Sequence, residues 1–373
     1  MSKARQLAQK PTQPTGRKNF LINADMRINQ RGDETGHSGA AYILDRWETS
    51  MYNTGSGTVD VSRATDAPSG FTKSMKFDVN AADSSQDANA QMYIEQQIEA
   101  QNIDWLKFYE ANPDTVTISF WVKSNLTGSF SATLKLSDNN SSHVSSSTRV
   151  YNFTYSISAA DTWEKKTKTI TLDSSTSETK ATGNNFGMSL AFWLAAGSSR
   201  DGVTADTWAN NGNATCDSDN LDLFASASNN WYVTGVQIEA GSVATEFEHR
   251  SYGEELQLCQ RYYIRYPSQE DGSPYLYYAL GLIHNTNTIY YTINLPVPMR
   301  VQPDLEISGA AHFTSVDSGT VRNLTNLTIV GNNFISNKAV AVAGTGSSLT
   351  AHRPSILRGD GTSGGFIAFE AEL

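Results

Sequence analysis

The feature that most limits how this chain can fold is a series of short segments rich in β-branched and aromatic residues, separated by clusters of Gly, Asn, Asp and Ser. Between Phe20 and Phe247 the series includes FLIN, TVDVSRA, SMKFDV, TVTISFWVKS, SFSATLKL, RVYNFTYSI, KKTKTITL, GMSLAFWLA and WYVTGVQIE. Strand-length segments bounded by turn residues are typical of β-sandwiches and jelly rolls. The sequence therefore predicts an all-β chain.

The segment TVTISFWVKS shows the strand pattern most clearly. Val116, Ile118, Phe120 and Val122 alternate with polar residues and with Trp121. Successive side chains of a strand point to opposite faces of the sheet. We expect the four apolar residues to lie in the core and Trp121 to lie on the other face. The stretch QMYIEQQIE that starts at Gln91 predicts a strand leading into a short helix.

The length of 373 residues favours two domains with separate cores. Residues 1–17 are polar and contain two prolines, so we expect an attachment peptide there. Residues 18–250 are predicted to form the jelly-roll β-sandwich, and residues 251–268 a helical connector. Residues 269–373 hold six more strand candidates and predict a second, smaller β-sandwich-like domain.

The connector is predicted from SYGEELQLCQRYY. Ser251 stands three residues before Glu254, which is the spacing of a capping box. Leu256, Cys259 and Tyr263 follow at i, i+3 and i+7 and would form one apolar stripe on a helix. We expect this stripe to form the neck of an oligomer, because a stripe so short does not fold alone.

Charge and cysteine content exclude several classes of protein. The net charge of −10 opposes binding to nucleic acid, which depends on Lys and Arg neutralising phosphates. The first residues contain no apolar run that resembles a signal peptide or a membrane span, so neither export nor membrane insertion is expected. Two isolated cysteines, Cys216 and Cys259, predict free thiols rather than a disulfide framework or a zinc site. No cofactor is expected.

Several phrases of the sequence together carry a family resemblance. They are NFLINADMRINQRG, DRW at 45–47, TISFWVKS, TWEKKTKTI, WYVTGVQIEAGSVATEFEHRSYGEELQLCQRYY and LPVPMR, which span about residues 18–300. They resemble bacteriophage tail-fibre and receptor-binding proteins, and the first domain resembles a jelly-roll carbohydrate-binding module. The resemblance implies a trimeric virion fibre, made in the cytoplasm of the infected bacterium, that attaches to host surface polysaccharide or lipopolysaccharide. Residues 1–17 would bind another virion tail protein.

The resemblance also exposes a departure. Many such modules have an acidic residue in the opening segment that helps to hold calcium, and Arg27 occupies that position here. Asp217, Asp219 and Asp222 carry oxygen ligands, but the Gly and the distal Glu of an EF-hand loop are absent, which favours a solvated loop. No metal site is expected.

Sugar binding needs an aromatic ring for the apolar face of the sugar and nearby amides for its hydroxyl groups. The candidates in predicted loops are Trp105 with Tyr109, and Trp208 with Asn210 and Asn211. The alternative for each Trp is that it covers an edge of the sandwich. In the second domain, tyrosines 275, 277, 278, 290 and 291 are numerous enough that some must face outward, where they would bind sugar or fill an interface.

Catalysis is not expected. His249 lies among Glu246, Glu248 and Glu254, but these residues are better explained as partners that orient the connector. No nucleophile-elbow spacing surrounds a serine, and no solenoid repeat carries paired carboxylates. Three functions remain open at this point: a host-attachment fibre, a structural head or collar appendage without a receptor role, and a glycan depolymerase.

Overall fold

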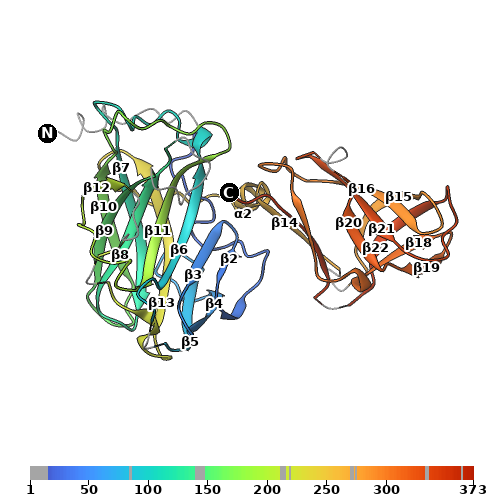
Figure 1. Cartoon of the computed structure of the whole chain (residues 1–373), viewed down its shortest axis with the longest axis horizontal. Coiled ribbons are helices and arrows are strands. Elements are labelled where there is room, and N and C mark those ends of the chain that lie inside the picture. Colours follow the sequence, from blue (N-terminus) through green and yellow to red (C-terminus); the bar gives the residue numbers. More distant parts are fainter. Residues whose placement is uncertain are drawn as a thin grey trace. The chain divides into compact units, whose positions relative to one another are not determined.

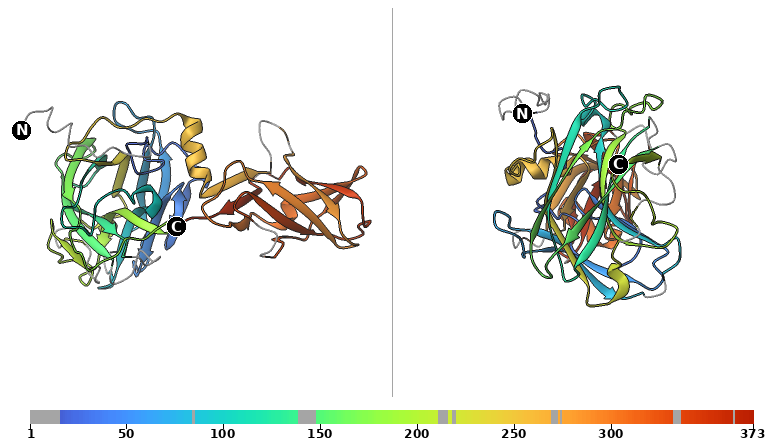
Figure 2. Two further views of the ribbon diagram at one scale, coloured as in Figure 1. Left: turned by 90° about the horizontal axis from the view of Figure 1, so that it is seen from above. Right: turned by 90° about the vertical axis from the view of Figure 1, so that its left-hand side faces the viewer.

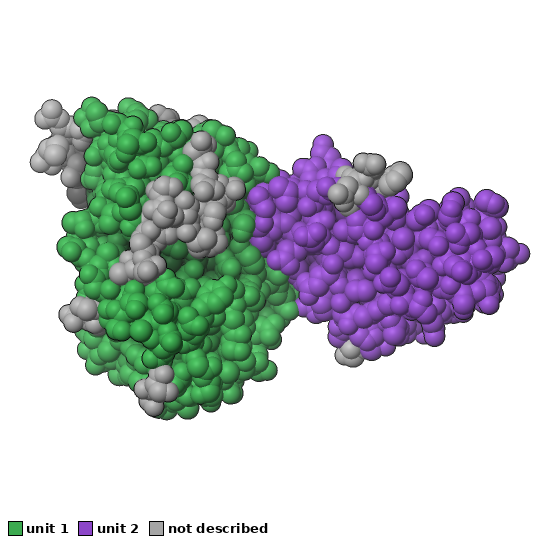
Figure 3. Space-filling view, viewed as in Figure 1, with its two compact units in different colours: residues 1–255, 373 green, residues 256–372 purple. Residues whose placement is uncertain are grey.

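The computed structural model describes residues 16–373, apart from 84–85, 139–147, 211–215, 218–219, 269–272, 274, 332–335 and 363. The chain forms two compact units, residues 1–255 with Leu373 and residues 256–372 (Figure 3). Strands dominate both units, and α2 (Tyr252–Gln260) is the one α-helix in the described part of the chain. The prediction of an all-β chain is confirmed.

The first unit is a sandwich of two antiparallel sheets that face each other (Figures 1 and 2). One sheet has six strands in the order β1 (Glu34–His37), β4 (Thr58–Ala64), β5 (Ser74–Ala81), β13 (Asn230–Ala240), β7 (Thr115–Ser124) and β10 (Glu164–Thr171). The other has seven, in the order β12 (Trp208–Asn210), β9 (Arg149–Ile157), β8 (Gly128–Leu136), β11 (Phe186–Ala196), β6 (Gln91–Glu99), β3 (Trp47–Tyr52) and β2 (Ala40–Leu44). This is the predicted jelly-roll sandwich.

The inner faces of the two sheets form one core. Val116, Ile118, Phe120 and Val122 of β7 are all fully buried in it, and Trp121 lies on the outer face, as the alternation predicts. The strand β6 leads into a short 3₁₀ turn, η1 (Ala100–Asn102), which confirms the expected change from strand to helix.

The prediction of a strand at FLIN is wrong. Residues 20–23 are buried but form no strand of their own, although the N–H of Phe20 donates to the carbonyl of Ile238 in β13 at 3.0 Å. Asn23 has a φ of 52°. Its side chain explains this turn, because the amide accepts from the N–H of Ile28 at 2.9 Å and donates to the carbonyl of Ile28 at 2.8 Å. A buried amide that pairs with its own neighbouring backbone replaces the ladder of a strand.

The residues of the family resemblance form a buried hydrogen-bond network that links the start of the first unit to its end. The Arg250 guanidinium donates to the carbonyls of Asn19 and Leu21 at 2.7 and 3.0 Å. The Glu248 carboxylate accepts from the backbone N–H groups of Lys18 and Asn19 at 2.7 and 2.9 Å. These sequence motifs therefore have a structural role, which is to hold the two ends of the first unit together.

The DRW motif at 45–47 contributes to the same hydrogen-bond network. Asp45 accepts from the backbone N–H of Gln30 at 2.6 Å, Arg46 donates to the carbonyl of Gln97 at 2.5 Å, and the Trp47 indole donates to the carbonyl of Asn23 at 3.1 Å. All three side chains of the motif are buried. Asp45 and Trp47 thus pair with buried backbone groups of the segment after residue 18, and Arg46 pairs with a backbone carbonyl of β6.

The predicted neck needs correction. The helix α2 begins after Ser251, whose hydroxyl accepts from the N–H of Glu254 at 3.2 Å, as a cap should. It ends at Gln260, so Tyr263 is not on it but begins β14 (Tyr263–Pro267). Leu256 is half-buried, while Cys259 and Tyr263 are fully buried within the protomer. Cys259 and Tyr263 are therefore not available to pack around an oligomer axis.

The second unit is also a sandwich. A three-stranded sheet, β14, β23 (Phe366–Glu370) and β17 (Asp304–Ile307), faces a seven-stranded sheet. The larger sheet has the order β19 (Thr320–Asn323), β18 (Phe313–Asp317), β22 (Pro354–Gly359), β15 (Tyr277–Ile283), β16 (Thr288–Asn294), β21 (Ala339–Thr345) and β20 (Asn326–Ile329). Because β14 belongs to this unit, the predicted connector 251–268 is helical only over Tyr252–Gln260.

Candidate functional site

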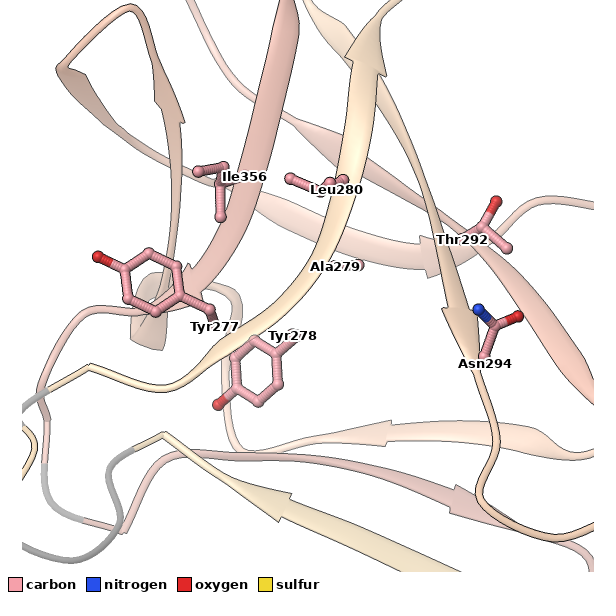
Figure 4. Close-up of a pocket in the computed structure, with 7 residues that line it drawn as sticks. All are labelled: Tyr277, Tyr278, Ala279, Leu280, Thr292, Asn294 and Ile356. Carbon is pink, nitrogen blue, oxygen red and sulfur yellow. The ribbon is translucent and has the colours of Figure 1, made fainter.

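The candidate site is a groove on the outer face of the seven-stranded sheet of the second unit (Figure 4). Its volume is about 580 Å³, within the range of ligand pockets. A smaller hollow of about 280 Å³ adjoins it and shares Tyr277, Tyr278 and Asn294 with it. The groove is lined by Tyr277, Tyr278, Ala279, Leu280, Thr292, Asn294 and Ile356.

A β-bulge at the start of β15 places the two tyrosines. Tyr277 pairs with Arg358 of β22, while Ala279 pairs with Leu357, so Tyr278 is an extra residue without a partner. A bulge of this kind redirects side chains. Tyr277 points outward and is 61% exposed, whereas Tyr278 is half-buried and its hydroxyl donates to the carbonyl of Pro267 at 2.8 Å. Tyr277 is thus the aromatic ring that the groove offers to a ligand.

The polar border of the groove comes from β16. Its alternation buries Ile289, Tyr291 and Ile293 and leaves Thr292 and Asn294 exposed. Figure 4 shows Thr292 and Asn294 on one side of the ribbon of β15 and Tyr277 on the other, with Leu280 between them. The hydroxyl and the amide supply both donors and acceptors.

The lining of the groove is uncharged. Arg358 lies at its margin, and its guanidinium stacks on the ring of Tyr275 with 4.1 Å between the carbon and the ring centroid. Burial raises the pKa values of Tyr278 and Tyr266, so their hydroxyls stay protonated as hydrogen-bond donors. A groove that offers both an aromatic ring and uncharged hydrogen-bonding groups suits a sugar, which presents an apolar face and hydroxyl groups.

Trp105 and Tyr109, two of the glycan-binding residues predicted from the sequence, both contact the core of the first unit. Trp105 packs edge-on against Phe20 with 6.0 Å between the ring centroids. Tyr109 is buried in the core, and its hydroxyl donates to the carbonyl of Leu136 at 3.1 Å. Tyr109 is therefore not open to a sugar, because the segment that carries it buries its apolar residues against the sandwich. Trp105 is half-buried, and its role in sugar binding stays a prediction.

Trp208 and Asn210 lie on β12, at the edge of the seven-stranded sheet of the first unit. The Trp208 indole donates to the carbonyl of Thr171 at 2.9 Å and its ring packs against Tyr151 at 5.3 Å. The amide oxygen of Asn210 accepts from Arg149. These contacts place Trp208 as a cover of the sandwich edge, and Asn211 lies outside the described residues.

The remaining sequence candidates have structural partners. Arg27 forms an ion pair with Asp25 at 2.5 Å, which places a cation where the resembling modules have an acidic residue. Asp222 caps a 3₁₀ turn by accepting from the N–H of Phe224, and Asp219 lies outside the described residues. His249 packs against Phe71 and Phe247. Across the residues that the structure describes, no group of three or more His, Cys, Asp or Glu is arranged to hold a metal ion.

The two cysteines are buried thiols, as predicted. Burial raises the pKa of the Cys216 thiol to about 12. Within the described part of the chain, no helix has the length and apolarity needed to span a membrane.

Of the tyrosines noted in the sequence, Tyr275, Tyr277 and Tyr290 are exposed and Tyr291 is buried. Thr292, Asn294, Leu280 and Ile356 were not predicted as site residues. The alternation in TIYYTIN contains the signal for Thr292 and Asn294, because it places them on the face opposite the buried isoleucines. No sequence signal identifies Ile356, which reaches the groove only through the pairing of β22 with β15.

Neither a family model nor a curated protein sequence matches the chain. Several solved structures do, at low similarity. The enzymatically active domain of tailspike protein 4 of bacteriophage CBA120 is 13% identical with a TM-score of 0.31, and the match covers 60% of this chain and 21% of that one. A putative sugar-binding protein of Bacteroides thetaiotaomicron is 12% identical with a TM-score of 0.33, over 60% and 100%. The CBM22-1 xylan-binding domain of Paenibacillus barcinonensis is 12% identical with a TM-score of 0.29, over 61% and 100%. What this chain binds therefore has to be argued from its own residues.

Proposed function

We propose that this chain is a bacteriophage fibre protein that attaches the virion to a bacterial surface by binding a glycan without cleaving it. The observation that carries the proposal is the groove that the exposed ring of Tyr277 lines together with the uncharged groups of Thr292 and Asn294 across β15. The resemblance of residues 18–300 to tail-fibre and receptor-binding proteins supports the virion role. Residues 1–17 are the proposed contact with another tail protein; of these, 1–15 lie outside the described residues.

In this proposal the Tyr277 ring packs against the apolar face of one sugar. Thr292 and Asn294 exchange hydrogen bonds with its hydroxyl groups, and the neighbouring hollow beside Tyr266 receives a second sugar. Binding of this kind uses no acid–base pair. Because the lining is uncharged, the proposal favours neutral sugars over sugars that carry carboxylate or phosphate groups.

The test is binding of the purified chain to surface polysaccharide of candidate host bacteria, measured by calorimetry together with an assay for reducing ends. We expect binding without release of reducing ends, and we expect Tyr277→Ala or Asn294→Ala to weaken it at least tenfold. Tyr52→Ala is the matched control, because Tyr52 lies in the first unit at a similar exposure of 52%. Equal loss in the control, or no loss in Tyr277→Ala, would place the ligand elsewhere.

A structural appendage without a receptor role remains the second candidate. The exposed Leu280 and Leu282 beside the groove favour it, because such side chains suit assembly with protein better than binding of sugar. A chain that binds to no host polysaccharide or cell, and that is present in the particle, would support this candidate. Release of reducing ends would instead identify a glycan depolymerase.

A further inference from the structure

The outer face of the seven-stranded sheet in the second unit is apolar beyond the groove. Leu280 is 74% exposed and Leu282 is 51% exposed, and Tyr290 and Val321 are exposed as well. These residues gather on one face, because cross-strand pairing places Leu282 beside Tyr290 and Pro354, Leu280 beside Ile356, and Val316 between Ile356 and Val321. We call this surface the apolar face; it consists of Leu280, Leu282, Tyr290, Val316, Val321, Pro354 and Ile356.

Such a surface is unusual for a chain that stays alone in water. Apolar patches of this continuity mark interaction sites, because covering them removes apolar area from water. The inner face of the same sheet already contributes Ile289, Tyr291, Val342 and Leu357 to the core of the unit. The apolar face is therefore a second apolar layer that the fold itself does not require.

We infer that the apolar face is covered by a second copy of this chain. The first argument is charge. The chain carries a net charge of −10, so two copies repel each other unless they meet through a surface without acidic groups. In the seven strands of this sheet, all within the described residues, the one charged side chain at an outward position is Arg358. Like-charged copies can approach here without placing acidic side chains against each other.

The second argument is shape. Next to the protruding side chains, β21 presents Ala339, Ala341 and Ala343 at its outward positions. One part of the face thus carries large side chains and the adjoining strand carries small ones. The leucines of one copy can occupy the space above the alanines of another, and an interface of this kind is self-complementary.

This inference replaces the neck predicted at Leu256, Cys259 and Tyr263, and its test does not depend on the proposed glycan binding. The second copy would also form part of the border of the groove. Leu280 and Ile356 belong both to the apolar face and to the lining of the groove. A copy that packs on Leu282 and Tyr290 would therefore border the groove.

The experiment is the mass of the full-length chain in solution, measured by light scattering over a range of concentrations. We expect an assembly for the wild type and a folded monomer for Leu282→Asp, which places a carboxylate in the interface without changing a residue that lines the groove. Val243→Asp is the matched control, because Val243 is 52% exposed in the first unit, and it should assemble as the wild type does.

A wild-type chain that stays monomeric at every concentration would overturn the inference and assign the face to a different protein. Assembly of Leu282→Asp at wild-type strength would overturn it too. If Leu282→Asp fails to fold, the milder Leu280→Ser decides, because a side chain exposed by 74% contributes little to the fold of the protomer. A weakened assembly of that variant supports the inference, and an unchanged one contradicts it.

Discussion

At the scale of single residues, Arg250 connects the start of the first unit to its end. It is buried and forms ion pairs with Glu248 at 2.8 Å and with Glu255 at 3.3 Å. Replacing it with Met leaves Glu255 buried without its cation, and we expect a loss of about 3–5 kcal/mol of unfolding free energy. Urea denaturation measures this loss. Lys168→Met, which removes the exposed pair with Asp206, should cost about 0–1 kcal/mol, and an equal cost for both variants would contradict the argument.

Glu248 makes the stability of this hydrogen-bond network depend on pH. Burial alone would raise its pKa, but the N–H groups of Lys18 and Asn19 and the Arg250 guanidinium lower it below the ordinary 4.5. A carboxylate with a lowered folded pKa stabilises above its unfolded pKa, and this contribution is lost as pH falls through the folded pKa. Glu248→Gln should therefore be less stable than the wild type at pH 7, and the difference should shrink below pH 4.5 in urea denaturation.

Burial raises the pKa of Glu255 in spite of Arg250, so its contribution has the opposite sign. Its stabilising part is present below the unfolded pKa and is lost as pH rises through the folded pKa. Glu255 shares the Arg250 guanidinium with Glu248, so its contribution is removed by comparing Glu248→Gln in a Glu255→Gln background with Glu255→Gln alone. A difference that grows toward acid pH would contradict the role given to Glu248.

The residues of this hydrogen-bond network could be identified from the sequence, but their contacts could not. The segment around Asn19 and the segment around Arg250 stand out as motifs, and Glu248 of the second binds the backbone N–H groups of Lys18 and Asn19 in the first. That the two segments contact each other across more than two hundred residues has no signal in one sequence. Pattern alone therefore located the residues without their partners.

At the scale of elements, Gly281 sets how closely β15 and β16 approach. A Cβ at this position would lie 2.3 Å from the carbonyl oxygen of Tyr290 and 2.4 Å from the Tyr291 ring. Gly281→Ala should therefore destabilise the second unit by about 1–3 kcal/mol through overpacking. Gly253→Ala in α2, where a Cβ meets nothing within 4 Å, should instead stabilise by up to about 1 kcal/mol. Thermal unfolding of both variants measures the contrast, and a neutral Gly281→Ala would contradict it.

Strands with strict alternation were predictable, and strands that break it were not. The period of β7 identified its buried face and placed Trp121 outside. In β15 the bulge at Tyr278 shifts the phase, so the residues that this strand contributes to the groove do not follow from period 2. The predicted helical stripe failed at Tyr263 for a related reason, because pairing of β14 with β23 ends the helix before that residue. Tertiary pairing overrides local pattern in both cases.

At the scale of the whole molecule, the proposed assembly and the proposed glycan binding meet in one expectation. A fibre that presents several grooves to one cell surface gains avidity from simultaneous binding, which can reach about 10²–10⁴-fold. Leu282→Asp should keep its affinity for soluble glycan, because Leu282 does not line the groove, and should lose this gain on cells. Tyr277→Ala should lose both.

Competition for adsorption tests this expectation. The purified chain is added to host cells before the phage, and the concentration that halves phage binding is measured for the wild type, Leu282→Asp and Tyr277→Ala. The wild type should block adsorption at the lowest concentration, Leu282→Asp should need more, and Tyr277→Ala should not compete. If Leu282→Asp competes as well as the wild type, the copies do not act together on the cell. If no variant competes, including the wild type, the groove does not serve host attachment, whatever the oligomeric state.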